Sequence, residues 1–506
     1  MTMDEEQSGQ AAAPAPKAPA SPVLTRRTVL GAATAAGIGV AASRLAALAN
    51  EPAFTTVPVT GSLANKGGLD WISPLDAEPA RVAHLFRRAT FGATQSELDQ
   101  STKDGYAKTV DRLLETKAVE PPVFPGGDEA SQDKGLNIGQ LQQWWVDHMA
   151  ATPTPFSERM TLFWHGHFTS DFRKVTPQTP YIYWQNLTWR KYALADLRTM
   201  LMQVTIDPGM LRYLDLGNSS GKAPNENYSR ELMELFTMGP EAFTEDDVKA
   251  AAKALAGWRE PLTQAMVDAQ IARAMQRGNA PKNPPKADVV KTGIFEKQRA
   301  YAGPPYAYLG ETKVWNTDLV LDKILAQDAT APFLVRKVLA HFVTPTPSDA
   351  YVARLATAFR KTKYDVKTLM RDVFTSPEFT APSSYRALIK TPTEFMLHMT
   401  KALGDRTLTK VVVQSGQGMG QMLFDPPSVG GWPENESWIS SNTVLARANF
   451  VTAALQGLKK LPSAANAHQT HLDGVLSPQT LKLLNEASDD KKRWSVVFAS
   501  PEFQLK

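Results

Sequence analysis

The stretch NENYSRELMELFTMG, residues 225–239, sets the helical character of this chain. With successive residues turned by about 100° in a helix, its large apolar side chains fall on one broad arc. That arc comprises Tyr228, Leu232, Met233, Leu235 and Phe236. Glu226, Arg230 and Glu234 follow one another along the opposite stripe. The pattern predicts an amphipathic helix over residues 227–238, capped by Asn225 or Asn227.

Glu231 lies at the seam between the two faces of this helix. Helix physics alone explains the asparagines and the outer charges, but it does not explain Glu231. A carboxyl group half desolvated beside Leu235 would have a raised pKa, which suits proton transfer or metal binding. Glu231 is therefore a candidate general base, with Glu234 as the alternative.

Other stretches extend the helical pattern. Thr94–Glu97 and Thr244–Asp247 have the spacing of capping boxes, and the helix opened by the second should stop at Gly257. Alternating strand-like runs are scarce. We therefore predict a mainly α protein with one large multi-helix domain over residues 75–506. An irregular insertion at about 262–316, rich in Pro and Lys, should include a short β-hairpin.

Composition excludes several classes of site. The chain has 506 residues and a net charge of only +4, and no long basic run indicates a nucleic-acid partner. It contains no cysteine, which excludes disulfides, thiolate zinc sites and cysteine nucleophiles. A divalent metal would have to be held by His, Asp, Glu or carbonyl oxygen.

The N-terminus has the order of features found in export signals. Arg26 and Arg27 precede a Gly/Ala-rich apolar stretch, and Ala47-Leu48-Ala49 offers a small-residue cleavage site. Residues 1–49 resemble a twin-arginine signal peptide, followed by a linker over 50–74. We expect export by the twin-arginine translocase to the periplasm or outside the cell. The apolar stretch is too short for a stable membrane span, so the mature protein should have none.

The stretch RMTLFWHGHFTSDFRK, residues 159–174, is a candidate metal site. If Gly166 ends the helix, as glycine favours, His165 and His167 lie on one side of an extended segment and can chelate one ion. Asp171, with His84 or Glu231 from elsewhere, could complete the ligand set. The alternative is an ordinary core turn with hydrogen-bonded histidines.

Two further stretches are candidates for ligand contact. Arg88, at the end of an apolar helix, could pair with a carboxylate of the 227–238 helix or clamp an anionic ligand. The loop that contains Trp432 and Trp438 could plug the core or line a cleft. Nucleotide binding at Gly416, Gly418 and Gly420 is rejected, because the glycine spacing is one residue short and no βαβ unit surrounds it.

Aromatic residues also gather between positions 144 and 192. The five tryptophans of this segment are Trp144, Trp145, Trp164, Trp184 and Trp189. Side chains of this kind at helical spacing usually form core, but exposed indoles could stack on sugar rings.

Several motifs in one order resemble the bacterial family called domain of unknown function 1800. They are HLFRRATFG, FWHGHF, NENYSRELMELFTMG, FTEDDVKAAAKALAGW, VFTSPEF, KTPTEF, MGQMLFDPPSVGGWPENESWISS and RANF. The resemblance implies an exported, mainly helical protein. It also implies a partner, because members are commonly encoded beside a second exported family, domain of unknown function 1501. It supplies no reaction and no catalytic residues.

The chain departs from that family pattern at one place. The stretch before the family's Leu-Gly usually includes a His-Asp pair, whereas residues 300–310 read AYAGPPYAYLG. If the pair binds a metal or takes part in catalysis, this member lacks the activity.

Two functions fit the sequence. The first is a hydrolase-like enzyme acting on an envelope or extracellular polymer. Its general base would be Glu231 or Glu234, its acid or metal ligands His165 and His167, and its substrate contacts the side chains of Arg88, Trp432 and Trp438. The second is a non-enzymatic protein that takes part in envelope assembly or binds carbohydrate or a partner protein. Both require distant segments to meet in one pocket.

Overall fold

The computed structural model describes residues 72–127, 135–175, 179–279 and 281–506. The predicted signal peptide, residues 1–49, and the linker as far as residue 71 lie outside the described residues. The described part is mainly α-helical with two small sheets, which confirms the predicted fold class.

The helices of the first half are α3 (Glu78–Ala89), α4 (Gln95–Asp104), α5 (Tyr106–Glu115), α6 (Ile138–Ala151), α7 (Pro155–His167), α8 (Phe172–Val175), α9 (Tyr181–Lys191), α10 (Leu197–Thr205), α11 (Pro208–Tyr213), α12 (Asn227–Glu234), α13 (Glu245–Leu255) and α14 (Gln264–Gln276). The helices of the second half are α15 (Thr317–Leu325), α16 (Thr330–Phe342), α17 (Asp349–Lys361), α18 (Val366–Phe374), α19 (Pro392–Leu403), α20 (Thr409–Gly416), α21 (Ser441–Gly457), α22 (Ala467–Leu472), α23 (Pro478–Glu486), α24 (Asp490–Ala499) and α25 (Pro501–Gln504). The strands are β1 (Trp258–Arg259), β2 (Ile294–Phe295), β3 (Tyr306–Tyr308) and β4 (Glu311–Lys313).

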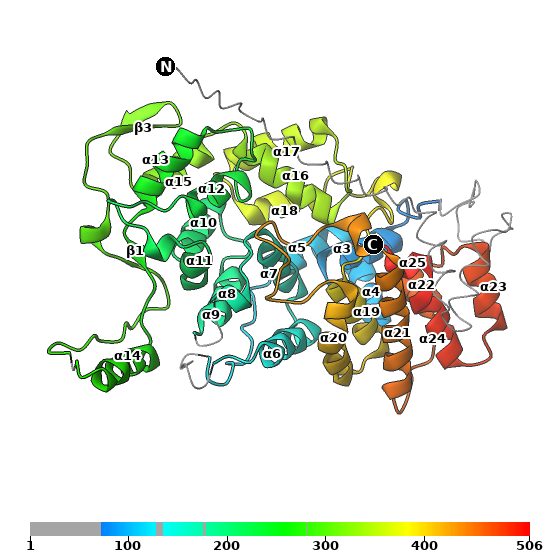
Figure 1. Ribbon diagram of the computed structural model, residues 1–506. Coiled ribbons are helices and arrows are strands. Elements are labelled where there is room, and N and C mark those ends of the chain that lie inside the picture. Colours follow the sequence, from blue (N-terminus) through cyan, green and yellow to red (C-terminus); the bar gives the residue numbers. More distant parts are fainter. Residues whose placement is uncertain (1–71, 128–134, 176–178, 280) are drawn as a thin grey trace, which may run out of the picture.

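The helices bury two large hydrophobic clusters. One is built mainly by α5, α10–α13 and α15–α18, and the other by α6, α9 and α19–α24. In Figure 1, α10–α13 and α15–α18 lie on the left and at the top, and α19–α24 lie at the lower right. Helix α7 lies between them and contributes Trp164 to the first cluster and Leu162 to the second. It therefore joins the two halves of the body.

Helix α7 is buried on almost every side, polar residues included. Such a helix is stable only if its buried polar groups find partners. The carboxylate of Glu158 accepts hydrogen bonds from Arg190 Nε at 2.5 Å and from Trp145 Nε1 at 2.9 Å. Arg159 forms an ion pair with Glu394 of α19. These contacts fix the position of α7 against α6, α9 and α19.

The opening helix of the sequence is shorter than predicted. Helix α12 ends at Glu234, and neither asparagine side chain caps it. Asn225 instead accepts the N–H of Asn227 at 2.9 Å. Arg230 is 3.7 Å from Glu226, as its spacing predicts, but it makes two closer hydrogen bonds, of 2.6 and 2.7 Å, to Glu245 of α13. Arg230 therefore serves mainly to join α12 to α13.

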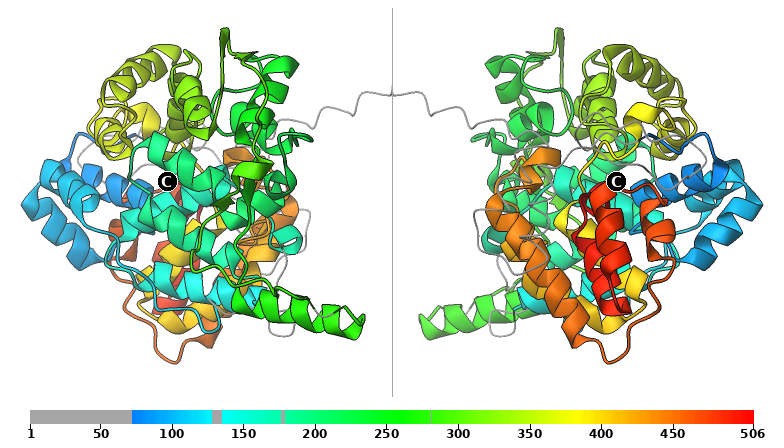
Figure 2. Two further views of the ribbon diagram at one scale, coloured as in Figure 1. Left: turned by 90° about the vertical axis from the view of Figure 1, so that its left-hand side faces the viewer. Right: turned by 90° about the vertical axis from the view of Figure 1, so that its right-hand side faces the viewer.

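Both predicted capping boxes are confirmed, at Thr94–Glu97 and at Thr244–Asp247. The predicted hairpin in the insertion is also confirmed, because β3 and β4 pair antiparallel. The insertion contains one helix that its Pro and Lys clusters did not indicate, α14, which projects from the body in Figure 2. Strand β2 then returns the chain to β1.

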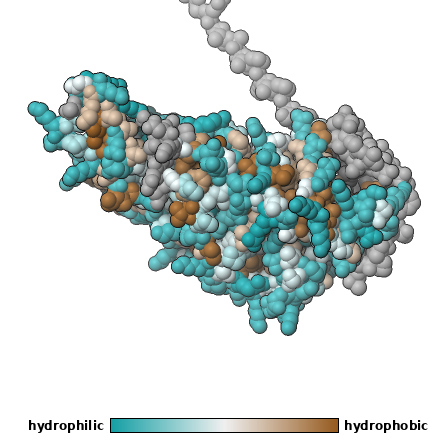
Figure 3. Space-filling model, turned by 90° about the horizontal axis from the view of Figure 1, so that it is seen from below, coloured by the Kyte–Doolittle hydropathy of each residue, from teal (hydrophilic) through white to brown (hydrophobic). Residues whose placement is uncertain are grey.

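The described surface has only scattered apolar side chains. The exposed large ones are Val119, Val123, Met275, Val289, Val290, Phe295 and Val314. On the face drawn in Figure 3, hydrophobic areas are small and separated by hydrophilic ones. No helix within the described ranges has the length and apolarity that crossing a membrane requires.

Candidate ligand-binding pocket

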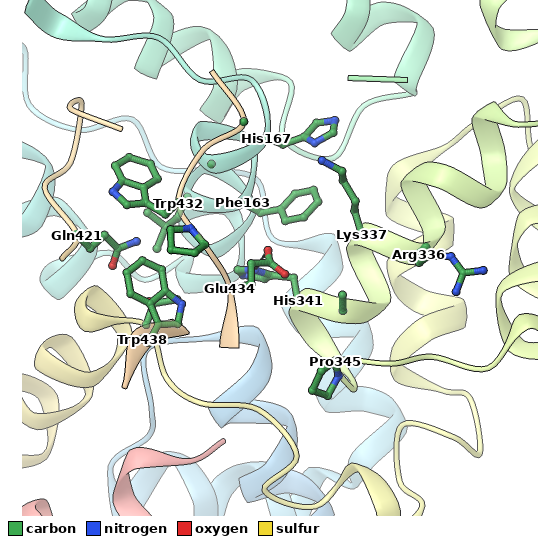
Figure 4. A pocket seen from close by; sticks show the side chains of 16 residues that line it. Phe163, His167, Arg336, Lys337, His341, Pro345, Gln421, Trp432, Glu434 and Trp438 are labelled. Carbon is green, nitrogen blue, oxygen red and sulfur yellow. Dashed lines mark ion pairs between the residues drawn. The ribbon is translucent and has the colours of Figure 1, made fainter. Parts of the chain in front are cut away.

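A pocket of about 360 Å³ opens where α7, α16 and the loop before α21 meet. Figure 4 shows Trp432, Trp438 and Gln421 on one side and His167, Lys337 and Arg336 on the other. Glu434 and His341 lie between the two sides. Three stretches that carry the family resemblance, residues 163–168, 390–395 and 419–441, supply most of the lining together with α16.

The expectation that Gly166 ends its helix is wrong, since α7 continues to His167. Glycine lowers helix stability by only about 1 kcal/mol, and packing on both sides of α7 outweighs that cost. In a continuous helix, residues two apart point in divergent directions. His165 and His167 therefore reach different surroundings and do not face one ion.

His165 lies behind the pocket wall. Its Nε2 accepts the N–H of Phe424 at 3.0 Å, and its ring is 5.2 Å from that of Trp432. Burial lowers the pKa of His165 to about 3, so the ring is neutral at neutral pH. His165 supports the loop and the indole of Trp432 from behind.

His167 lines the pocket with its ring. Its Nε2 lies 3.0 Å from the carbonyl oxygen of Phe236, so this nitrogen carries the proton and donates it. Burial, then Lys337, lowers the pKa of His167 well below its ordinary value. His167 is the one predicted catalytic residue that reaches the pocket, and it is held neutral.

The predicted metal ligands do not converge. No group of three or more His, Asp or Glu side chains arranged to hold a metal occurs among the described residues. Asp171 instead accepts the N–H and the guanidinium of Arg173, at 2.7 and 3.2 Å. His84 is buried and lies 3.1 Å from the carbonyl oxygen of Phe379.

The carboxylates proposed as general base lie outside the pocket. Glu231 is half-buried, and burial followed by the neighbouring Glu234 raises its pKa, as its position at the helix seam predicts. Neither Glu231 nor Glu234 lines the pocket. The raised pKa of Glu231 is therefore a property of its surroundings on α12, outside the pocket lining.

Arg88 is fully buried and donates from Nη2 to the carbonyl oxygen of Ser384. It forms no ion pair with another described residue, so the predicted pairing with the 227–238 helix is not formed, and Arg88 does not line the pocket. Burial, then Arg87, lowers the pKa of Arg88 to about 9.

Helix α16 supplies pocket residues that the sequence did not single out, among them Lys337 and His341. Nε2 of His341 is 3.4 Å from Nη2 of Arg159. Arginine can only donate, so Nε2 accepts and the proton of His341 is on Nδ1. Nδ1 faces Oε1 of Glu434 at 3.5 Å. Burial lowers the pKa of His341, which keeps the ring neutral beside Glu434.

Glu434 is the carboxylate of the pocket. Its side chain is 54% exposed and projects from the loop next to Trp432. Burial raises the pKa of Glu434, but the contact with His341 outweighs this effect and the net pKa is lowered. Glu434 is therefore ionised at neutral pH. The sequence signal for the opposite wall was the Lys337–His341 pair, polar side chains four residues apart on one face of a mostly apolar helix.

The family model described as "Protein of unknown function (DUF1800)" matches residues 84–505. The chain belongs to the DUF1800 family. No curated protein and no solved structure matches it.

In this DUF1800 protein, the stretch without the His-Asp pair lies apart from the pocket. Residues 306–308 form β3, and Tyr308 packs its ring 5.1 Å from that of Trp315. No residue of 300–310 lines the pocket. The missing pair therefore does not alter the pocket lining.

The tryptophans between positions 144 and 192 form core in this DUF1800 protein. Four of them are at most 5% exposed: Trp145, Trp164, Trp184 and Trp189. Trp144 is half-buried and donates to the carbonyl oxygen of Pro122 at 2.6 Å. Sugar stacking on these four buried indoles is excluded by their burial.

Gly431 allows the loop that carries Trp432 to lie close to α7. Gly431 has a φ of +84°, and a Cβ at this position would lie 2.2 Å from the carbonyl oxygen of Gly166. A side chain here is both strained and obstructed, so the loop can approach α7 only with glycine. The neighbouring Gly430 has no such restriction, since a Cβ there would meet only Ser428 Oγ, at 3.5 Å.

We expect Gly431→Ala to lower the free energy of unfolding by about 1–3 kcal/mol and to displace Trp432 from the pocket. Gly430→Ala, its neighbour in the same loop, should change stability by about 0.5 kcal/mol or less. Urea unfolding of both variants measures the difference. Equal losses in the two variants would contradict the assigned role of Gly431.

Proposed function

We propose that this protein is exported and binds a carbohydrate-type ligand in the pocket between α7, α16 and the Trp432 loop. The observation that carries the proposal is the pairing of an indole wall with a polar wall across a space of about 360 Å³. Sugars combine apolar ring faces with hydroxyl groups. A site for them needs both aromatic surface and hydrogen-bonding side chains.

The indole wall is supported by neighbouring side chains. Trp432 is partly exposed, and the ring of His165 lies against it at 5.2 Å. Trp438 is 4% exposed and closes the wall at its base. A ring that is already fixed loses little conformational freedom when a ligand stacks on it.

The polar groups can reach ligand hydroxyls. Gln421 and Glu434 line the pocket, and the carboxylate of Glu434 is ionised and exposed enough to accept from a hydroxyl. Charged acceptors give hydrogen bonds roughly twice as strong as neutral ones. The export signal indicated by Arg26 and Arg27 supports a ligand of the cell envelope or its surroundings, and a partner of the domain of unknown function 1501 family fits the same compartment.

Hydrolysis of a polymer is the second candidate, and Glu434 supports it. An ionised carboxylate beside a neutral histidine is suited to act as a base toward water. Glycoside hydrolysis by the usual route needs two carboxyl groups flanking the bond. Glu434 is the sole carboxylate among the described lining residues, which favours binding over turnover.

Affinity electrophoresis in gels that contain envelope and extracellular polysaccharides tests the proposal. Retardation by at least one polysaccharide is expected, with no release of reducing ends over the same period. Migration unchanged in every gel would contradict the binding function. Release of reducing ends by the parent but not by Glu434→Gln would instead establish the hydrolase.

A further inference from the structure

We infer that the ligand of this pocket is an acidic sugar, and that its carboxylate pairs with Lys337. The inference rests on the proposed carbohydrate-binding function and specifies its ligand class. The observations that support it are the contacts and the partial burial of the Lys337 amine.

Lys337 reaches the pocket from α16, on the wall opposite Trp432. Figure 4 shows its amine end pointing toward His167. Its contacts are the carbonyl oxygen of Leu235, at 3.4 Å, and the ring of Phe333, whose centre is 5.0 Å from Nζ. Lys337 forms no ion pair with another described residue.

Half-burial of an ammonium group without a carboxylate is unfavourable. Burial accordingly lowers the pKa of Lys337, and the more distant Glu434 opposes this effect only in part. An anionic ligand group would supply the missing counter-charge and stabilise the ammonium form.

The other charged groups of the pocket already have partners. Arg336 donates to Asp349 at 2.7 Å, and Figure 4 shows its guanidinium pointing away from Trp432. Glu434 faces His341, and Arg159 beyond it is paired with Glu394. His167 and His341 are neutral at neutral pH. Lys337 is thus the cation of this lining that is left for a ligand.

The geometry also fits one molecule that spans both walls. A pyranose ring stacked on Trp432 would direct a ring substituent across the pocket toward α16. A carboxylate on that substituent reaches Lys337, while hydroxyls on the other edge reach Glu434 and Gln421. Glu434 repels a second negative charge, so the pocket selects a sugar with a single carboxylate directed at Lys337.

Binding of uronate disaccharides and their methyl esters tests this inference, because esterification removes the charge and keeps the ring. We expect the acid to bind at least about tenfold more tightly than its ester at pH 7 in calorimetric titration. The preference should shrink as salt is added. Lys337→Met should abolish the preference, Lys337→Arg should keep it, and Lys410→Met, an exposed lysine elsewhere, should leave it unchanged.

The two proposals fail differently in this experiment. Equal binding of acid and ester, or a preference that survives in Lys337→Met, overturns the acidic-sugar inference and leaves carbohydrate binding intact. Binding of neither form, together with unchanged migration in every polysaccharide gel, overturns both. Circular dichroism of Lys337→Met and Lys337→Arg confirms that each variant is folded.

Discussion

Arg190→Met is expected to lower the free energy of unfolding by about 3–5 kcal/mol, because it removes one partner of a buried ion pair. Arg190 and Glu158 are both fully buried, and two hydrogen bonds of 2.5 and 3.0 Å join them. Methionine keeps the apolar stem and leaves the carboxylate of Glu158 without its counter-charge. Unfolding by urea at pH 7 measures the loss.

A surface arginine supplies the matched control. Arg198 pairs with Asp318 and Asp322 at 2.6 Å each, but both aspartates are more than half exposed. Solvent-exposed pairs contribute about 0–1 kcal/mol, so Arg198→Met should have a much smaller effect. A loss as large as that of Arg190→Met would show that burial is not what makes the Glu158 pair important.

The same pair predicts an acid dependence. Burial raises the pKa of Glu158, but Arg190 and His148 outweigh burial and lower it to about 2. A carboxyl whose pKa is lower in the folded state contributes stability above its ordinary pKa of 4.5. That contribution is lost as the pH falls toward 2. In Arg190→Met, burial is no longer opposed by Arg190 and raises the pKa of Glu158 above 4.5. The stability difference between the parent and Arg190→Met should therefore begin to narrow above pH 4.5 and continue to narrow as the pH falls toward 2.

Trp432→Ala should weaken carbohydrate binding by about 30-fold or more, the effect of removing about 2 kcal/mol of contact energy. Trp432 offers the partly exposed indole of the pocket, and the ring of His165 supports it from behind. Calorimetric titration with the polysaccharide fragment that binds the parent most tightly measures the loss.

Two companion variants separate stacking from folding. Trp432→Phe keeps an aromatic face and should recover most of the affinity. Trp144→Ala removes a half-buried indole outside the pocket lining and should leave the affinity unchanged. Equal affinities for Trp432→Ala and the parent would show that the Trp432 indole does not contribute to carbohydrate binding.

The fold was predictable where local chemistry decides it. Thr94 with Glu97 and Thr244 with Asp247 begin helices because their side chains satisfy backbone N–H groups within the same turn. The hairpin of β3 and β4 is equally local. Gly166 shows the limit, because its local preference to end a helix is overridden by packing on both sides of α7.

The pocket was only partly predictable for the same reason. Trp432 and His167 were identified, since aromatic and imidazole side chains beside glycines stand out in the sequence, and Trp438 was identified with Trp432 as part of the same loop. Lys337 and His341 were missed because they lie on α16, whose place opposite Trp432 depends on the two hydrophobic clusters. Glu231 was identified by its position at a helix seam, and this position explains its raised pKa. The position on the helix does not indicate which other segments of the fold lie opposite Glu231.

Binding of a sugar against the indoles of the pocket is tested most directly by ¹⁹F NMR of protein in which all eleven tryptophans are replaced by 5-fluorotryptophan. The Trp432 and Trp438 signals are assigned through phenylalanine variants, and the acidic disaccharide is then added to saturation. We expect the Trp432 signal to shift most, followed by that of Trp438, while the signals of the buried Trp145, Trp164, Trp184 and Trp189 stay in place. A saturable shift confined to tryptophans outside the pocket, with Trp432 unmoved, would contradict this expectation.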